Sequence, residues 1–526
     1  ANKTVTHDEI WHLPVGLLHW QRGRFDADTL NPPLTRAWAA LPAWIAGGRV
    51  ESSLNSPEVA WPFIREQGSA AFRSYWLGRA ANLAFSILTC LIVFRWAHDW
   101  WGGTGAGLAT LLCAACPNIL AHASLVTPDA GLLCGWTATL YLFTRWRAAP
   151  GWRTAVLLGL VLGLTQATKY TAVLLYPLLG LLWLCCGRLH APLPGAGGAV
   201  GASDSGTTHS SRWRELLHLF SAFAVSLLVL NLCYLGQGAG WRLADFQFES
   251  STLQMLQQQA GSLAQLPLPV PADYIDGIDR QRAVMEQLHP CFLNGRWSVT
   301  GFPDYFVWTL ALKLPHHLQL LALLGGVILL IRRSIPDRRA RLLILLLPAT
   351  ALMLVASMSR LQLGVRYILP VLPPLMLAAG ACGVWLDQCR PGVRRAALIF
   401  VGPAALGAVR PHRNHLGYFN ALAGGPVGGR QHLLDSNLDW GQDLHLVRDF
   451  MHARQLDQIG LAYFGTWPAD ELGINFTVPP SWRPEAGWYA VSVNYVMGRP
   501  HALFQPDGTR RAVTDLEEAH QARRLA

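Results

Sequence analysis

The feature that most constrains this chain is a series of long apolar runs separated by short polar connections. A helix that crosses a bilayer needs roughly 20 consecutive apolar residues. Runs approaching this length occupy 79–97, 104–122, 129–145, 154–168, 170–187, 215–235, 315–331, 342–358, 367–386 and 396–410. About ten such runs predict a polytopic α-helical membrane protein.

The composition agrees with this fold class and argues against one large soluble core. The 526 residues are 52% hydrophobic and only 14% charged, whereas soluble domains carry about 25% charged residues. Many of the 22 tryptophans stand at the ends of apolar runs. Tryptophan at those positions is typical of the aromatic belt at a membrane interface.

The positively charged residues predict the orientation. Lys and Arg outnumber Asp and Glu by 42 to 32, and arginines cluster in the connections 145–153, 188–214, 332–341 and 390–395. Counted from the run at 79–97, all four connections fall on one side, which the positive-inside rule makes cytoplasmic. Membrane topology therefore explains the basic charge, and we expect no nucleic-acid partner.

This topology divides the chain into three parts. We expect a first periplasmic loop with amphipathic helices over 1–78, a transmembrane domain over 79–410 with a long periplasmic loop at 236–314, and a periplasmic tail over 411–526. A strand-like run at 488–496 predicts that the tail is a small α/β domain.

Two adjacent acids, Asp8 and Glu9, stand in the first loop, ahead of an amphipathic stretch at 11–25 suited to the interface plane. Adjacent side chains point in different directions, so the two acids need not share a role. One would accept a proton from an acceptor hydroxyl while the other orients the loop or binds a sugar. Alternatively, both are solvated loop charges.

A third acid, Asp129, begins the apolar run at 129–145. An Asp in that place favours a helix N-terminus, where free N–H groups and the helix dipole stabilise it. The functional alternative is that Asp129 faces the same cavity as Asp8.

Two cations, Lys169 and Arg366, stand at the ends of apolar runs on the periplasmic side. A charge at membrane depth is costly and usually functional. Lysine binds phosphate as a point charge, and the planar fork of arginine matches phosphate oxygens. Both residues could equally be interfacial anchors.

The tail run at 435–443 is rich in Asp, Asn and Gln. Asn437, Asp439 and Trp440 could bind sugar hydroxyls there, although a turn that caps a following helix uses the same residue types.

With these motifs the chain resembles the bacterial phospholipid-carrier-dependent glycosyltransferases of the GT-C superfamily, similar to protein O-mannosyltransferases and to the aminoarabinose transferase that modifies lipid A. The matching elements are Asp8-Glu9 ahead of Asn31-Pro32-Pro33-Leu34, Thr127-Pro128-Asp129, Thr168-Lys169-Tyr170-Thr171, Arg366-Tyr367-Ile368-Leu369-Pro370 and the run from Tyr418 through Asp443. Family members carry a transmembrane helix ahead of the acidic pair, and the sequence given leaves open whether one precedes residue 1.

The resemblance implies a GT-C-like enzyme of the bacterial inner membrane with a periplasmic active site. It implies Asp8 as catalytic base, Asp129 nearby, and Lys169 and Arg366 on the carrier phosphate. The donor would be a polyprenyl-phosphate sugar, and the acceptor a periplasmic lipid, glycan or protein. Superfamily members differ in metal use, so the resemblance leaves a divalent metal open as a cofactor. His7 and His12 near Asp8 could ligate it, although we expect both to be simple loop residues.

Two other functions share this composition. A transporter or flippase would place its functional charges in broken helices near the midplane, whereas the acids here fall in loops. A noncatalytic assembly subunit would not need the Asp8–Glu9 pair.

Overall fold

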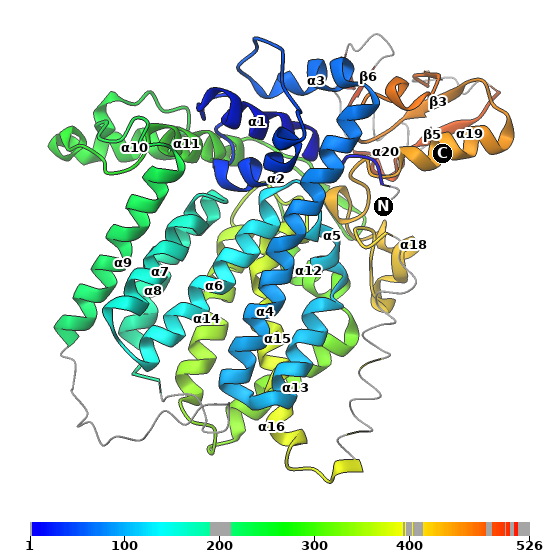
Figure 1. Ribbon diagram of the computed structural model, residues 1–526. Coiled ribbons are helices and arrows are strands. Elements are labelled where there is room, and N and C mark those ends of the chain that lie inside the picture. Colours follow the sequence, from blue (N-terminus) through cyan, green and yellow to red (C-terminus); the bar gives the residue numbers. More distant parts are fainter. Residues whose placement is uncertain are drawn as a thin grey trace.

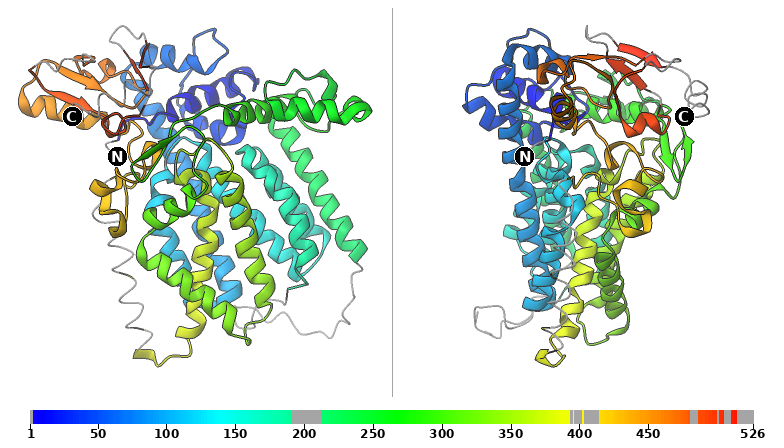
Figure 2. Two further views of the ribbon diagram at one scale, coloured as in Figure 1. Left: turned by 180° about the vertical axis from the view of Figure 1, so that it is seen from behind. Right: turned by 90° about the vertical axis from the view of Figure 1, so that its right-hand side faces the viewer.

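The computed structural model describes residues 3–189, 212–392, 395, 402, 414–479, 486–499, 501–504 and 510–513. A long helical body is capped at one end by a platform of shorter helices and small sheets (Figures 1 and 2). The platform brings together segments from the start, middle and end of the chain.

The body is built from the apolar runs. Its helices are α4 (Ser69–Ala114), α5 (Pro117–Ala123), α6 (Pro128–Ala148), α7 (Trp152–Gln166), α8 (Leu175–Cys185), α9 (Arg212–Cys233), α12 (Tyr305–Lys313), α13 (His316–Ile331), α14 (Arg338–Ser357), α15 (Leu372–Gly380) and α16 (Cys382–Leu386), with 3₁₀ turns η2 (Tyr170–Leu174) and η5 (Val365–Val371).

Helices in the described residues are long and apolar enough to cross a membrane in four places, and the bent pair α12–α13 would add a fifth. The prediction of a multi-pass helical membrane protein is therefore confirmed. The predicted total of about ten spans stays a prediction, because several body helices are short and the run at 396–410 lies outside the described residues except for Gly402.

Helix α4 contains the predicted run 79–97 and the first part of the run 104–122, which continues into α5, and the helix reverses between the two runs. Gly102 has φ 75° and ψ −170°, which breaks the helix; glycine adopts positive φ without a steric penalty. The Cys90 and Cys113 sulfurs lie only 3.6 Å apart, although a straight helix would separate them by roughly 35 Å. The two limbs are therefore antiparallel.

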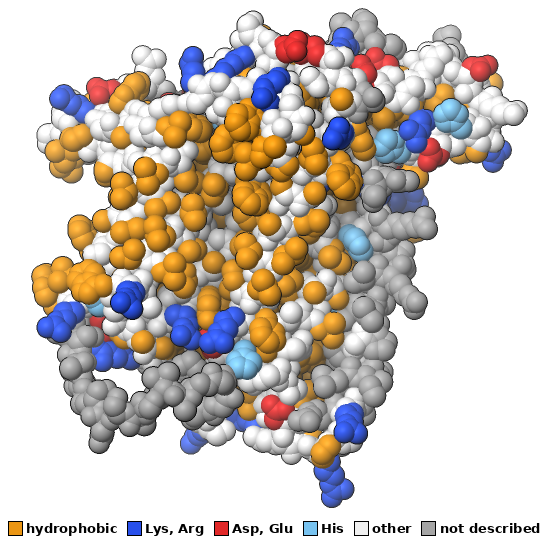
Figure 3. Space-filling view, viewed as in Figure 1, with side chains coloured by type: hydrophobic (Ala, Val, Ile, Leu, Met, Phe, Trp, Pro, Cys, Tyr) orange, Lys and Arg blue, Asp and Glu red, His pale blue; other side chains and the backbone are white. Residues whose placement is uncertain are grey.

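The surface of the body is suited to lipid. Large apolar side chains cover the face seen in Figure 3, and basic side chains gather at the end opposite the platform. Among the exposed apolar residues are Leu88, Leu91, Leu160, Leu228, Leu232, Leu323 and Leu330. Exposed apolar surface of this extent is typical of a membrane interface.

The platform begins with α1 (Glu9–Arg22), α2 (Pro33–Ile45), η1 (Pro57–Val59) and α3 (Ala60–Gln67). The amphipathic pattern at 11–25 suggested that the apolar face of α1 meets lipid, but in the structure this face is buried against protein. Leu13, Leu17 and Leu18 are buried, and Gly16 packs so closely on α2 that an added Cβ would lie 2.3 Å from the Arg36 carbonyl oxygen.

The middle of the chain adds η3 (Leu243–Asp245), α10 (Ser251–Ala260), η4 (Gly261–Gln265), α11 (Ala272–Glu286) and the antiparallel pair β1 (Cys291–Leu293) and β2 (Arg296–Ser298). The tail adds η6 (Ala421–Ala423), α18 (Gly425–Gly429), η7 (Asp435–Asn437), α19 (Leu444–Arg454), η8 (Asp470–Leu472) and α20 (Val493–Val496).

The tail also contains a small parallel sheet in the order β4-β3-β5, which confirms its α/β character. Its strands are β3 (Ile459–Ala462), β4 (Phe476–Thr477) and β5 (Tyr489–Val491), and an antiparallel pair follows, β6 (His501–Phe504) and β7 (Arg510–Val513). The strand-like run at 488–496 proves to be β5 followed by α20. Apolar residues of α19 and β3 share one core with α1 and α3.

Helices α7 and α9 pack closely against each other, and this packing can be tested by substitution of a glycine. An added Cβ on Gly163 would lie 2.5 Å from the Ser226 carbonyl oxygen and 2.6 Å from the Val229 Cβ, so the helices approach where glycine removes side-chain bulk. Overpacking costs about 1–3 kcal/mol. We expect Gly163→Leu to lower the melting temperature in detergent, whereas Gly107→Leu, which meets nothing within 4 Å, should not. Equal melting temperatures would contradict this packing.

Candidate active site

A cavity of about 560 Å³ lies where the platform meets the body, and four of the predicted site residues line it. These are Asp8, Asp129, Lys169 and Arg366. They come from the turn before α1, the first turn of α6, the residue before η2, and η5. Residues separated by up to 358 positions in the chain thus surround one space.

Asp8 forms an ion pair with Arg366, with 2.5 Å between Oδ2 and Nη1. The Arg366 guanidinium also stacks on the rings of Trp440, at 4.4 Å, and Tyr367, at 5.2 Å. Burial alone would raise the pKa of Asp8, but the positive charge of Arg366 outweighs it, with help from His7 and His12, so the pKa lies below its usual value. Asp8 is therefore ionised at neutral pH, which is the form a general base requires.

Asp129 and Lys169 form the second ion pair of the cavity. The Lys169 amine donates to Asp129 Oδ1 at 2.7 Å, and the same amine lies 4.9 Å from the Tyr367 ring. Asp129 is almost fully buried, and its Oδ2 has no hydrogen-bond partner among the described residues. In the described part of the chain no side-chain hydrogen bond caps α6, so the contact that the structure shows for the Asp129 carboxylate is its ion pair with Lys169.

The rest of the cavity wall is divided by polarity. One part is apolar and comes from η2, α11, α14 and its following loop; it includes Val173, Leu174, Ile278, Met285, Val355 and Leu361. The polar part contains the two ion pairs. A cavity of this kind can hold a ligand with an anionic group at one end and a hydrocarbon chain at the other.

Glu9 does not line the cavity. It is fully buried, and its Oε2 accepts hydrogen bonds from Thr6 and Arg79 while its Oε1 accepts from Arg79 and the Val126 N–H. Of the roles considered for this acid, orientation of the loop fits the contacts. Glu9 joins the first segment to α4 and to the chain entering α6.

Asn437 and Trp440 are placed behind the cavity, although the sequence suggested that they bind substrate. Asn437 is buried, and its Oδ1 accepts the Val365 N–H at 3.0 Å. Trp440 covers the guanidinium of Arg366. Both residues therefore support η5 and its arginine, and neither is among the residues that line the cavity.

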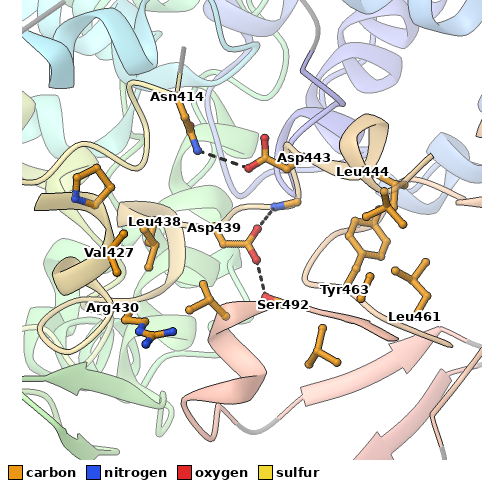
Figure 4. A pocket seen from close by; sticks show the side chains of 16 residues that line it. Asn414, Val427, Arg430, Leu438, Asp439, Asp443, Leu444, Leu461, Tyr463 and Ser492 are labelled. Carbon is orange, nitrogen blue, oxygen red and sulfur yellow. Dashed lines mark hydrogen bonds between the residues drawn. The ribbon is translucent and has the colours of Figure 1, made fainter. Parts of the chain in front are cut away.

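Asp439 faces a second cavity of about 400 Å³ in the tail (Figure 4). Its carboxylate accepts hydrogen bonds from the Gly441 N–H and the Ser492 hydroxyl. Val427 and Arg430 lie on one side of this cavity and Leu461 and Tyr463 on the other.

Among the described residues, no group of three or more His, Cys, Asp and Glu side chains is placed to hold an ion. His7 stacks on Phe464, and His12 accepts a hydrogen bond from Arg36.

Several lining residues carried no clear sequence signal. Gln281 and Arg282 of α11 cover the cavity, but they belong to an ordinary polar run within the loop 236–314. Asn31 and Tyr367 also line it, and each stands inside one of the motifs noted in the sequence. The motifs around Asn31 and Tyr367 therefore indicated that these segments belong to the site, but they did not show which role either residue has.

A comparison with protein families matches residues 70–202 to the model described as dolichyl-phosphate-mannose-protein mannosyltransferase. The resemblance to lipid-carrier glycosyltransferases is confirmed for this segment. It covers the end of the first loop, the helix α6 that carries Asp129, and Lys169 in the residue before η2. No curated protein matches the chain.

Solved structures with similarity to this chain include two membrane glycosyltransferases. ArnT from Cupriavidus metallidurans, bound to undecaprenyl phosphate, matches with 15% identity and a TM-score of 0.44 over 78% of this chain and 63% of its own. The oligosaccharyltransferase AglB from Archaeoglobus fulgidus, with an inhibitory peptide and a dolichol-phosphate, matches with 14% identity and a TM-score of 0.45 over 89% of this chain and 59% of its own. This chain therefore spans about three fifths of either protein.

The two adjacent acids should respond differently to neutral substitution. Glu9→Gln leaves Arg79 without its buried carboxylate, and breaking a buried ion pair costs roughly 3–5 kcal/mol. We expect Glu9→Gln to lower the melting temperature by several degrees in detergent. Asp8→Asn should change it less, because the Asp8 side chain is partly open to the cavity, whereas Glu9 is fully buried. A Glu9→Gln protein as stable as the wild type would contradict the orienting role.

Proposed function

We propose that the protein transfers a sugar from a polyprenyl-phosphate carrier to an acceptor hydroxyl, and that the reaction takes place in the cavity lined by Asp8, Asp129, Lys169 and Arg366. One observation carries the proposal: two acids and two cations converge on a single cavity that also has an apolar wall. The confirmed resemblance over residues 70–202 points to the same chemistry.

The cations would bind the carrier phosphate. Its phosphodiester carries one negative charge, and departure of the sugar leaves a phosphate monoester with greater negative charge. Lys169 and Arg366 would stabilise that developing charge, which lowers the barrier to cleavage of the bond between the sugar and the phosphate. The prenyl chain would lie along the apolar wall formed by residues such as Val173 and Val355.

Asp8 would act as the general base. It would take the proton of the acceptor hydroxyl as that oxygen attacks the anomeric carbon, while the phosphate leaves from the opposite side. A single displacement of this kind inverts the anomeric configuration. Asp129, which forms an ion pair with Lys169, would hold that lysine in place beside the donor.

The site would face the periplasm of a bacterial cell. The described parts of the arginine-rich connections lie at the end of the body opposite the platform, where basic side chains gather in Figure 3. By the positive-inside rule that end is cytoplasmic, which leaves the cavity on the periplasmic side. A periplasmic lipid, glycan or protein could supply the acceptor hydroxyl.

The proposal is tested by turnover of a panel of polyprenyl-phosphate sugars with purified protein in nanodiscs. We expect the wild type to release polyprenyl phosphate, and Asp8→Asn to lower kcat by about 100-fold or more, because a general base contributes roughly 10²–10⁴-fold. Donor binding should persist in the variant, since both cations remain.

A matched control is Asp304→Asn, which changes an exposed acid outside the cavity. It should leave kcat and KM unchanged. A folded Asp8→Asn protein with full activity would exclude Asp8 as the base. A wild type that neither binds nor consumes any carrier sugar would contradict the transferase function itself.

A further inference from the structure

The long periplasmic loop forms an arm, residues 241–268, that extends sideways beyond the helical body. In Figure 1 and in the reverse view of Figure 2, the segment that contains α10 projects past α9 at the level where α9 meets the platform. Two backbone hydrogen bonds close the base of the arm, from Gly240 N to the Leu268 carbonyl and from Leu268 N to the Trp241 carbonyl.

The arm is ordered by contacts of its own. Phe246 and Phe248 form a small core with Ala272, and Leu253 packs against it. Asp279 of α11 accepts hydrogen bonds from the N–H groups of Glu249 and Ser250. The arm is thus fixed to α11, the helix that covers the candidate active-site cavity.

The outer surface of the arm is unusual for a segment outside the helical body. No charged residue occurs from 250 to 272, whereas the surface of a soluble protein is about 25–35% charged. Four large apolar side chains are more than half exposed, namely Met255, Leu256, Leu263 and Leu266. Trp241, at the base of the arm, is half exposed as well.

The two faces of α10 differ in polarity. Leu253 and Gln257 point toward the rest of the arm, since both are partly buried. Leu256 is exposed on one flank and Gln254 and Gln258 on the other, with Met255 and Gln259 between them. At about 100° per residue, Gln258 lies roughly 200° around the helix from Leu256. An exposed apolar flank on a short amphipathic helix is suited to the membrane interface.

The surface next to the arm indicates what covers the exposed apolar side chains of α10. The arm follows directly from α9, whose Leu228 and Leu232 are exposed on the lipid-facing surface of the body, and Leu235 continues the apolar surface to the base of the arm. Tryptophan at such a boundary is typical of the headgroup region. The apolar flank is therefore continuous with the surface that meets lipid.

We infer that the arm lies in the headgroup region of the bilayer, with Met255, Leu256, Leu263 and Leu266 in contact with lipid. A lipid contact there holds α11 at the membrane surface. Since Ile278 and Met285 of α11 line the active-site cavity, the membrane itself positions the cover of that cavity. The inference depends on membrane insertion and not on the reaction catalysed.

Spin labels on α10 test the inference in full-length protein in nanodiscs. A nitroxide is attached to a cysteine introduced by Leu256→Cys or, as the matched control, Gln258→Cys, after the exposed Cys185 is replaced by serine. Molecular oxygen concentrates in lipid, and a nickel chelate remains in water. We expect the label at 256 to collide mainly with oxygen and the label at 258 mainly with the chelate, a several-fold difference in their ratio.

Two outcomes would overturn the inference. Equal exposure of both labels to the nickel chelate would place the arm in water. A label at 256 shielded from both reagents would indicate that protein covers the apolar flank. Size-exclusion elution and melting temperature equal to those of the parent protein establish that each labelled variant is folded, so that either result applies to the native arrangement.

Discussion

The arrangement of this site depends on one ion pair, between Asp8 in the first segment and Arg366 in η5. A buried ion pair repays its desolvation only when its geometry is good and its remaining polar atoms are supported. Trp440 supplies part of that support, because its ring covers the Arg366 guanidinium while its carbonyl accepts the His7 N–H. Three distant segments of the chain thus meet at one charged contact.

Other contacts hold the arginine side of the pair in place. Gly364 precedes η5 with φ 143° and packs so closely on the tail that an added Cβ would lie 2.6 Å from the Ser436 hydroxyl. The next N–H, that of Val365, is fixed by Asn437, and Lys313 donates to the Asn437 carbonyl at 2.7 Å. The tail therefore belongs to the architecture of the cavity and is not a separate appendage.

Under the proposed function, the two ion pairs also explain how the site could respond to its donor. Without ligand, Asp8 neutralises Arg366, and Asp129 neutralises Lys169. A carrier phosphate would compete for both cations. As Arg366 turned toward the phosphate, the charge that depresses the pKa of Asp8 would be shared, and Asp8 would become a stronger base when the donor is present.

The fold class and the neighbourhood of the site could be predicted from the sequence because hydropathy and topology are local signals. Asp8 stood in the predicted first periplasmic loop, and Asp129, Lys169 and Arg366 stood at the ends of apolar runs on the same side of the membrane. The structure brings these four residues together; their catalytic and binding roles stay predictions. What the sequence could not supply was long-range packing. Neither the position of Trp440 behind Arg366 nor the cover provided by α11 has a local pattern.

The reversal within α4 and the burial of α1 show the same limit in the fold. An amphipathic pattern predicts that one face of a helix is buried, but it does not show whether lipid or protein covers that face. In α1 the partner proved to be α2 and its neighbours.

The central claim is that one cavity holds the carrier phosphate between Lys169 and Arg366. A cryo-electron microscopy structure of the protein in nanodiscs with bound polyprenyl phosphate would test it most directly. The account predicts phosphate density within hydrogen-bonding distance of both side chains, with the prenyl chain along Val173, Leu174 and Val355. Phosphate density at another site, with this cavity unchanged, would contradict it.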